Sequence, residues 1–225
     1  MSEIAKEEKS EKVGGLAFFL SFFSLAILSA LNIFNLFKLF IRAADWTEWR
    51  FFLLGIVLGS LFAQRFIKGW VSVFLHELRH AILSNLVGNK WKGLEVKDQS
   101  GHFEYAYTAK TARFNAFVAL APYWLPLFTV VGGGASVAVA FKYRVALLIA
   151  VAFFYGIDLV LNFRDISPVQ SDITEIKGGY GIGLFYIVIV NTFLFTIMAA
   201  WVTDGVPGLK FLVLEIWRMF SVVIK

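Results

Sequence analysis

Residues 178–203 read GGYGIGLFYIVIVNTFLFTIMAAWVT, a run of 26 positions without a charged side chain. A helix that crosses the hydrocarbon core of a bilayer needs about 20 predominantly apolar residues, so this run predicts a membrane span. The runs 13–37 and 114–141 are uncharged over a similar length, and the run 145–163 is interrupted only by Asp158. These four stretches therefore predict four membrane-spanning helices.

The stretch 51–87 predicts two more helices, at about 49–66 and 69–87, the second with a polar cluster near its middle. Over the whole chain the hydrophobic residues make up 59%, and the charged residues make up 16% against about 25% in soluble domains. These values exclude a soluble globule and a disordered chain. We expect an all-α polytopic membrane protein with about six transmembrane helices, or five if 51–64 enters the membrane only in part.

We expect one transmembrane domain at 13–225, preceded by a flexible charged tail at 1–12. The amphipathic stretch 211–224 predicts a short helix at the membrane interface. The net charge is +5, which we assign to loops that face anionic lipid. Nucleic acid is not expected as a partner, because the basic residues are scattered between apolar runs.

We expect a multi-pass integral protein of the cell (inner) membrane, with the lipid bilayer as its surroundings. The first apolar run, at 13–37, is longer than a signal-peptide core of about 7–15 residues, so it predicts a retained anchor. Lys and Arg are nearly balanced on alternate loops, and the orientation in the membrane is therefore left open.

Residues 90–108 predict a β-hairpin outside the membrane. The segments LEVK at 94–97 and HFEYAY at 102–107 alternate in a period of two, and DQSG at 98–101 is typical of a turn between them.

The sequence His76-Glu77-Leu78-Arg79-His80 matches the zinc-binding pattern HExxH. On a helix, residues four apart lie on the same face, so both imidazoles can reach one metal ion. Glu77 is rotated by about 100° from His76, where it can deprotonate a water on the metal without binding the metal itself. Polar groups in an apolar segment are costly, and a metal site explains them better than a polar contact between helices.

A catalytic zinc site keeps three protein ligands and one open position, so a third ligand must come from another segment. The chain has no cysteine, which leaves His, Asp and Glu. Asp172 is the favoured ligand because Pro168 breaks the helix before it, although an N-cap is an alternative role for this side chain. Asp165 is the runner-up and Asp158 the third candidate. His102 is not favoured, because the predicted hairpin places it at a different depth from a buried site.

Pro122 and Pro126 stand four residues apart within the run 114–141 and predict a kink or a break. Broken backbone in a membrane is tolerated where it lines a wet cavity, so these prolines indicate a wall of an aqueous chamber, or alternatively a packing kink. Two pairs of glycines predict close packing between spans: Gly55 with Gly59, and Gly179 with Gly183.

An HExxH motif in a membrane helix, then a hairpin, then a later membrane segment with an aspartate resembles the site-2-protease family of intramembrane zinc metalloproteases. In that family an Asn and a Pro precede the ligand Asp. Here Asn162, Pro168 and Asp172 follow in the same order, in the segment at about 158–180. The resemblance covers roughly 69–180.

The resemblance implies that Zn²⁺ is bound by His76, His80 and Asp172, that Glu77 is the general base, and that Asn162 contacts an extended substrate strand. Two positions depart from the family. Arg79 precedes the second histidine where many members have Gly, and Ile173 follows Asp172 in place of Gly.

Two functions follow from these residues. The first is a zinc metallopeptidase that cleaves transmembrane protein substrates, with Glu77 activating a zinc-bound water. The alternative is a non-proteolytic metal-binding or transport protein that retains the His76 and His80 site. Glu77 separates them, because a hydrolase cannot lose this carboxylate and a metal carrier can.

Overall fold

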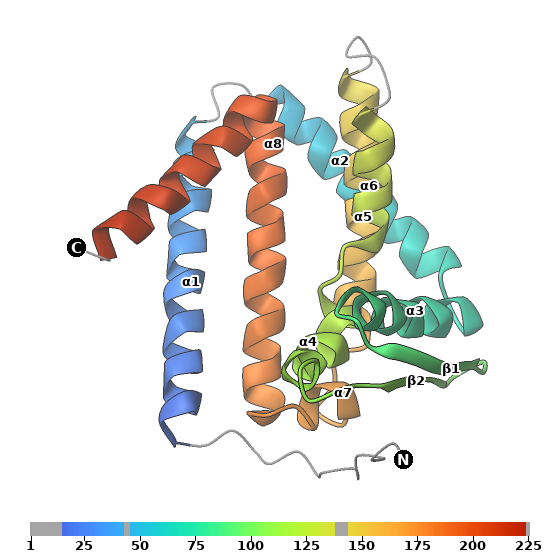
Figure 1. The fold of residues 1–225 in the computed structure, drawn as a ribbon. Coiled ribbons are helices and arrows are strands. Elements are labelled where there is room, and N and C mark those ends of the chain that lie inside the picture. Colours follow the sequence, from blue (N-terminus) through green and yellow to red (C-terminus); the bar gives the residue numbers. More distant parts are fainter. Residues whose placement is uncertain (1–14, 43–45, 138–143, 224–225) are drawn as a thin grey trace.

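The computed structural model describes residues 15–42, 46–137 and 144–223, and the chain is mostly helical with one two-stranded antiparallel sheet (Figure 1). The charged tail predicted at 1–12 lies outside the described residues. In chain order the elements are α1 Gly15–Arg42, α2 Thr47–Phe66, α3 Trp70–Leu86, β1 Lys90–Val96, β2 Gly101–Ala106, η1 Ala112–Phe114, α4 Asn115–Leu120, η2 Ala121–Tyr123, α5 Leu127–Val137, α6 Arg144–Arg164, α7 Ser171–Thr174 and α8 Gly179–Val223.

Three helical stretches are long and apolar enough to cross a membrane: Thr47–Phe66, Val145–Arg164 and Gly179–Arg218. A fourth results if the bent pair Ala112–Tyr123 and Leu127–Gly134 is counted as one span. Helix α1 contributes a shorter apolar stretch, Ser29–Ile41. The described residues are thus compatible with an integral membrane protein, but they do not contain the six spans that the sequence predicted.

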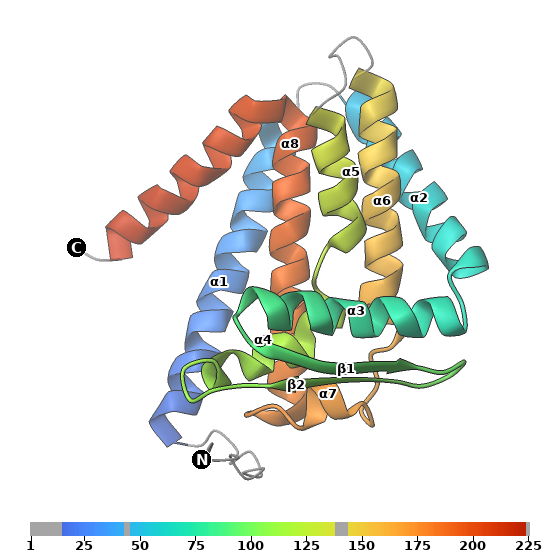
Figure 2. The same ribbon diagram turned by 45° about the vertical axis from the view of Figure 1, so that its right-hand side comes forward.

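Helix α3 accounts for part of this difference. The predicted helix at about 69–87 is present, but α3 runs crosswise to the long helices α6 and α8 instead of alongside them (Figure 2), and it contacts the end of α6 through Ser72 and Arg164. Its 17 residues span about 26 Å, which is less than the hydrocarbon thickness of about 30 Å. Gly69 makes the turn from α2 into α3 with a φ of 55°, a left-handed value that favours glycine.

Helices α2 and α6 pack closely through glycine. A Cβ atom on Gly59 would lie 1.9 Å from the carbonyl oxygen of Phe153, and one on Gly156 would lie 2.3 Å from that of Ile56. A Cβ on Gly55 would meet the Cβ of Ala152 at 2.6 Å. The packing role predicted for Gly55 and Gly59 is therefore confirmed.

The second glycine pair behaves differently, because its two members have different surroundings. Gly183 packs against α7, where an added Cβ would meet Ile173 at 2.7 Å, but nothing lies within 4 Å of the corresponding position on Gly179. Only Gly183 therefore makes the predicted close contact.

The predicted hairpin is confirmed as strands β1 and β2. Leu94 pairs with Phe103 and Glu95 pairs with His102 in an antiparallel register. Both strands run along α3 and pack against it (Figure 2). The hairpin therefore packs on one side of α3, the helix that carries the HExxH motif.

The proline pair breaks the backbone as predicted. Helical segments on the two sides of the break, Ala112–Tyr123 and Leu127–Gly134, meet at 77°. Helix α8 is also bent, because Asp204 and Gly205 have non-helical torsion angles and Gly205 has a φ of 59°. The stretch predicted as an interface helix at 211–224 belongs to the segment after this bend, and its side chains Val213, Leu214 and Trp217 are exposed.

Candidate metal centre

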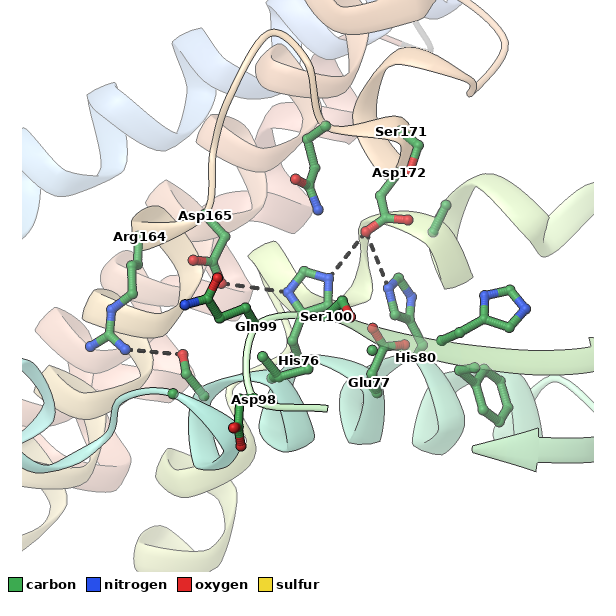
Figure 3. A pocket seen from close by; sticks show the side chains of 18 of the residues that line it. His76, Glu77, His80, Asp98, Gln99, Ser100, Arg164, Asp165, Ser171 and Asp172 are labelled. Atoms are coloured by element: carbon green, nitrogen blue, oxygen red, sulfur yellow. Dashed lines mark hydrogen bonds and ion pairs between the residues drawn. The ribbon is translucent and has the colours of Figure 1, made fainter. Parts of the chain in front are cut away.

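Three predicted ligands converge in the folded chain. His76 and His80 stand one turn apart on α3, and Asp172 reaches them from α7 (Figure 3). The Oδ2 atom of Asp172 lies 3.1 Å from Nε2 of His76 and 3.3 Å from Nε2 of His80. One ligand atom from each of the three residues lies within 4.8 Å of the others, so the group could hold a metal ion. We call His76, His80 and Asp172 the metal group.

The separations suit a small metal ion. Zn²⁺ holds nitrogen and oxygen ligands at about 2.0–2.1 Å in a tetrahedron, which places neighbouring ligand atoms about 3.3 Å apart. Where an Nε2 atom carries no hydrogen, its lone pair repels those of the Asp172 oxygen at these N–O distances of 3.1 and 3.3 Å. A cation among them, either a proton or a metal, removes this repulsion. Two imidazoles and one carboxylate form a donor set that zinc accepts.

Groups around the ligands fix their orientation. Nδ1 of His80 lies 2.8 Å from the carbonyl oxygen of Val118, so this nitrogen carries the hydrogen and Nε2 is left to face Asp172. The hydroxyl of Tyr123 donates to Oδ2 of Asp172 at 3.4 Å, and the Tyr123 ring meets His76 edge to face. Burial opposes ionisation of Asp172, but the protonated forms of His76 and His80, which donate hydrogen bonds to its carboxylate, outweigh burial and hold its pKa below the usual range.

The N-cap role considered for Asp172 is not observed. Gln170 is the N-cap residue of α7 and has no side-chain capping bond. The carboxylate of Asp172 is directed at the two imidazoles instead.

Glu77 lies beside the metal group under the hairpin. Its side chain packs against Gly101, where an added Cβ would lie 2.5 Å from Cγ and 2.7 Å from Oε1 of Glu77. Burial raises the pKa of Glu77, and the charges of His80 and His76 oppose that rise without cancelling it. A carboxylate with a raised pKa is a stronger base, which suits proton transfer.

Arg79 is buried and does not contact the metal group. Its guanidinium forms an ion pair with Asp158 at 2.6 Å and donates to the carbonyl of Pro122 at 2.7 Å and to Oδ1 of Asn162 at 2.8 Å. In an unbroken helix the Pro122 carbonyl would accept from the N–H of residue 126, but Pro126 has none. Arg79 supplies the missing donor, so its side chain stabilises the backbone at the proline break instead of contacting the metal group.

Asp158 and Asn162 complete this buried network. Asp158 also accepts from the backbone N–H of Phe128 and of Thr129 at the start of α5, at 3.2 and 2.7 Å. Asn162 donates to Asn191 of α8 at 2.7 Å. Asp158, the third candidate ligand, thus binds Arg79 and caps α5. Asn162 is buried with its amide oxygen and nitrogen both bonded, so it faces the network rather than a substrate strand.

A cavity of about 990 Å³ opens on the metal group. His76, Glu77, His80 and Asp172 line it, together with polar residues of the hairpin turn and of the segment after α6: Asp98, Gln99, Ser100, Asp165, Gln170 and Ser171. His102 also lines this cavity, so the hairpin is closer to the metal group than the sequence suggested. Among the described residues His102 is not part of the three-residue ligand group.

Asp165, the runner-up ligand, lies on the other side of the His76 ring from Asp172 (Figure 3). Its Oδ2 atom is 3.6 Å from Nδ1 of His76, whereas Asp172 faces Nε2. The sequence did not predict the contacts of Tyr123 and Val118 with the candidate ligands. Val118 lines the cavity, but neither Pro122 nor Pro126 is among the described residues that line it, so the chamber wall predicted from the two prolines is not observed. No family model matches the chain, and no curated protein or solved structure is significantly similar to it.

Proposed function

We propose that this protein is an intramembrane zinc metalloprotease that hydrolyses peptide bonds of membrane-spanning substrates. The proposal rests on one observation: Oδ2 of Asp172 lies 3.1 and 3.3 Å from the Nε2 atoms of the two HExxH histidines. Glu77 lies beside them and lines the same cavity. Two imidazoles, one carboxylate and an adjacent second carboxylate are the parts that zinc-dependent hydrolysis requires.

A zinc ion bound by His76, His80 and Asp172 would supply a Lewis acid that polarises the scissile carbonyl and acidifies a water. Glu77 takes the proton of the attacking water and returns it to the leaving amine. Val118 and Tyr123 hold His80 and Asp172 in place through the hydrogen bonds described above. The polar residues of the cavity admit the water that hydrolysis consumes.

The surroundings of the cavity support a substrate in the membrane. Several large apolar side chains on α2 are exposed, as expected for a helix that faces lipid: Leu53, Leu54, Val57, Leu58 and Leu61. The cavity lies next to the end of α6, a stretch long and apolar enough to span a membrane. We therefore propose a multi-pass protein of the cell (inner) membrane, with a transmembrane protein as substrate.

The decisive experiment replaces Glu77 by Gln, which keeps the size of the side chain but removes its ability to accept the proton. We expect Glu77→Gln to retain zinc and to cleave about 10²–10⁴-fold more slowly than wild type. Cleavage is measured on a panel of co-expressed single-span membrane proteins, and zinc and thermal stability are measured on the same purified samples. Glu104→Gln is the matched control, because Glu104 is an exposed carboxylate of β2 that pairs with Lys92.

Two results would contradict the proposal. A stable, zinc-loaded Glu77→Gln protein that cleaves as fast as wild type would remove Glu77 from the reaction. A zinc-loaded wild type that cleaves no member of the panel would favour the alternative function, a non-proteolytic metal-binding or transport protein with the same ligands.

A further inference from the structure

The imidazole of His76 lies between two carboxylates that come from the same segment of chain. Nε2 faces Asp172 at 3.1 Å, and Nδ1 faces Asp165 at 3.6 Å (Figure 3). One nitrogen of a neutral imidazole carries a hydrogen and the other a lone pair. Only the nitrogen with the lone pair can bind a metal, so the two carboxylates cannot have the same role.

The second histidine shows which role belongs to which side of the ring. His80 also directs Nε2 at Asp172, and its Nδ1 lies 2.8 Å from the carbonyl oxygen of Val118. Asp165 lies on the corresponding side of the His76 ring, at the longer N–O distance of 3.6 Å. Histidines that bind metals almost always donate their other N–H to a carboxylate, a carbonyl or a water, and this bond selects the tautomer and the ring orientation.

The fold holds Asp165 near His76 through its neighbour. Arg164, the last residue of α6, donates to the carbonyl of Ala63 at 3.1 Å and to the hydroxyl of Ser72 at 3.0 Å. These bonds tie the end of α6 to the end of α2 and to the first turn of α3, the helix that carries His76. Asp165 follows directly, so the position of its carboxylate relative to the imidazole is set by three helices.

We infer that Asp165 is a positioning residue, which accepts the Nδ1–H of His76 and leaves Nε2 free for the metal. This inference rests on the metal site of the proposed function but not on proteolysis. Without the carboxylate, His76 can adopt the tautomer with hydrogen on Nε2, which cannot bind a metal, and the ring loses one of its two restraints.

The test measures the affinity of the purified full-length protein for Zn²⁺, by competition with a fluorescent chelator in detergent. We expect Asp165→Ala to bind zinc about 10–100-fold more weakly than wild type, the usual effect of removing such a partner. Asp165→Asn retains an acceptor oxygen and should recover part of the loss. Asp98→Ala is the control, since Asp98 lines the same cavity and its loss also removes one carboxylate.

Three results for zinc affinity would overturn the inference, and they differ in what they imply for the metal site. Asp165→Ala with the affinity of wild type overturns the inference and leaves the metal site intact. Loss of zinc as complete as in His76→Ala overturns it too, because Asp165 would then be a ligand. A wild type without zinc affinity overturns the metal site and the inference together. Asp165→Leu, which has a similar shape and no acceptor, replaces Asp165→Ala in these comparisons if the alanine variant does not fold.

Discussion

Arg79 stands immediately before His80, yet its side chain belongs to a different part of the molecule. The guanidinium is 1% exposed and connects Asp158 of α6 with the carbonyl of Pro122 at the proline break. Val118, which binds His80, lies one turn before Pro122. Arg79 therefore stabilises the backbone that holds His80.

Removal of this side chain should destabilise the protein strongly. Arg79→Met leaves Asp158 buried without its cationic partner, and loss of one member of such a pair costs about 3–5 kcal/mol. Combination with Asp158→Asn removes the uncompensated charge and should recover much of the loss. Thermal unfolding in detergent measures both, with Arg50→Met at an exposed position of α2 as the control. An Arg79→Met protein as stable as the control would show that the ion pair contributes nothing.

At the scale of single residues, the sequence identified the three residues of the candidate metal site but not their partners. The spacing of His76 and His80 follows from helix periodicity, and the break at Pro168 favoured Asp172 over Asp165. The direction of Arg79 was not predictable, since it depends on Asp158 and Pro122, which are distant in sequence. For the same reason Asn162 was assigned to a substrate, whereas in the structure it bonds to Arg79 and Asn191.

At the scale of elements, the hairpin and α3 form one unit around Glu77. Strand β2 begins at Gly101, whose position leaves no room for a side chain above Glu77 and Val73. The close approach of the strand to the helix requires glycine here. The backbone of Gly101 does not have the positive φ that would require it. The position of the hairpin thus determines the space around the proposed base.

This contact gives a prediction with a matched control. In Gly101→Ala the new Cβ would lie 2.5 Å from Cγ of Glu77 and 2.8 Å from Cγ1 of Val73, so either the carboxylate or the strand must move. We expect slower cleavage with unchanged zinc content. Gly93→Ala in β1 meets nothing within 4 Å and should behave as wild type. Equal cleavage by the two variants would show that the hairpin does not position Glu77.

The elements themselves were largely predictable, but their directions were not. The uncharged run 178–203 predicts most of α8, and the alternation in 90–108 predicts the hairpin. The run 69–87 also forms its helix. Apolar length determines whether a helix can span a bilayer, but the crosswise direction of α3 depends on tertiary contacts with the hairpin and α6, which local sequence does not contain.

At the scale of the whole molecule, the candidate metal centre forms only if distant segments of the chain assemble. Helix α3 brings two ligands, and the chain must pass through the hairpin, the proline break and α6 before α7 brings the third (Figure 2). Neither segment has a complete ligand set alone. Metal binding therefore reports on the fold as a whole as well as on the three side chains.

The zinc content of the purified protein shows directly whether His76, His80 and Asp172 bind a metal ion. Protein purified in detergent without chelator should contain about one zinc ion per chain, and His76→Ala and Asp172→Ala should contain close to none, because a zinc site of this kind needs three protein ligands. Elemental analysis of the three samples at matched protein concentration gives the answer. A wild type that holds no zinc and takes none up, or an Asp172→Ala protein with the zinc content of wild type, would show that these three residues are not a zinc site.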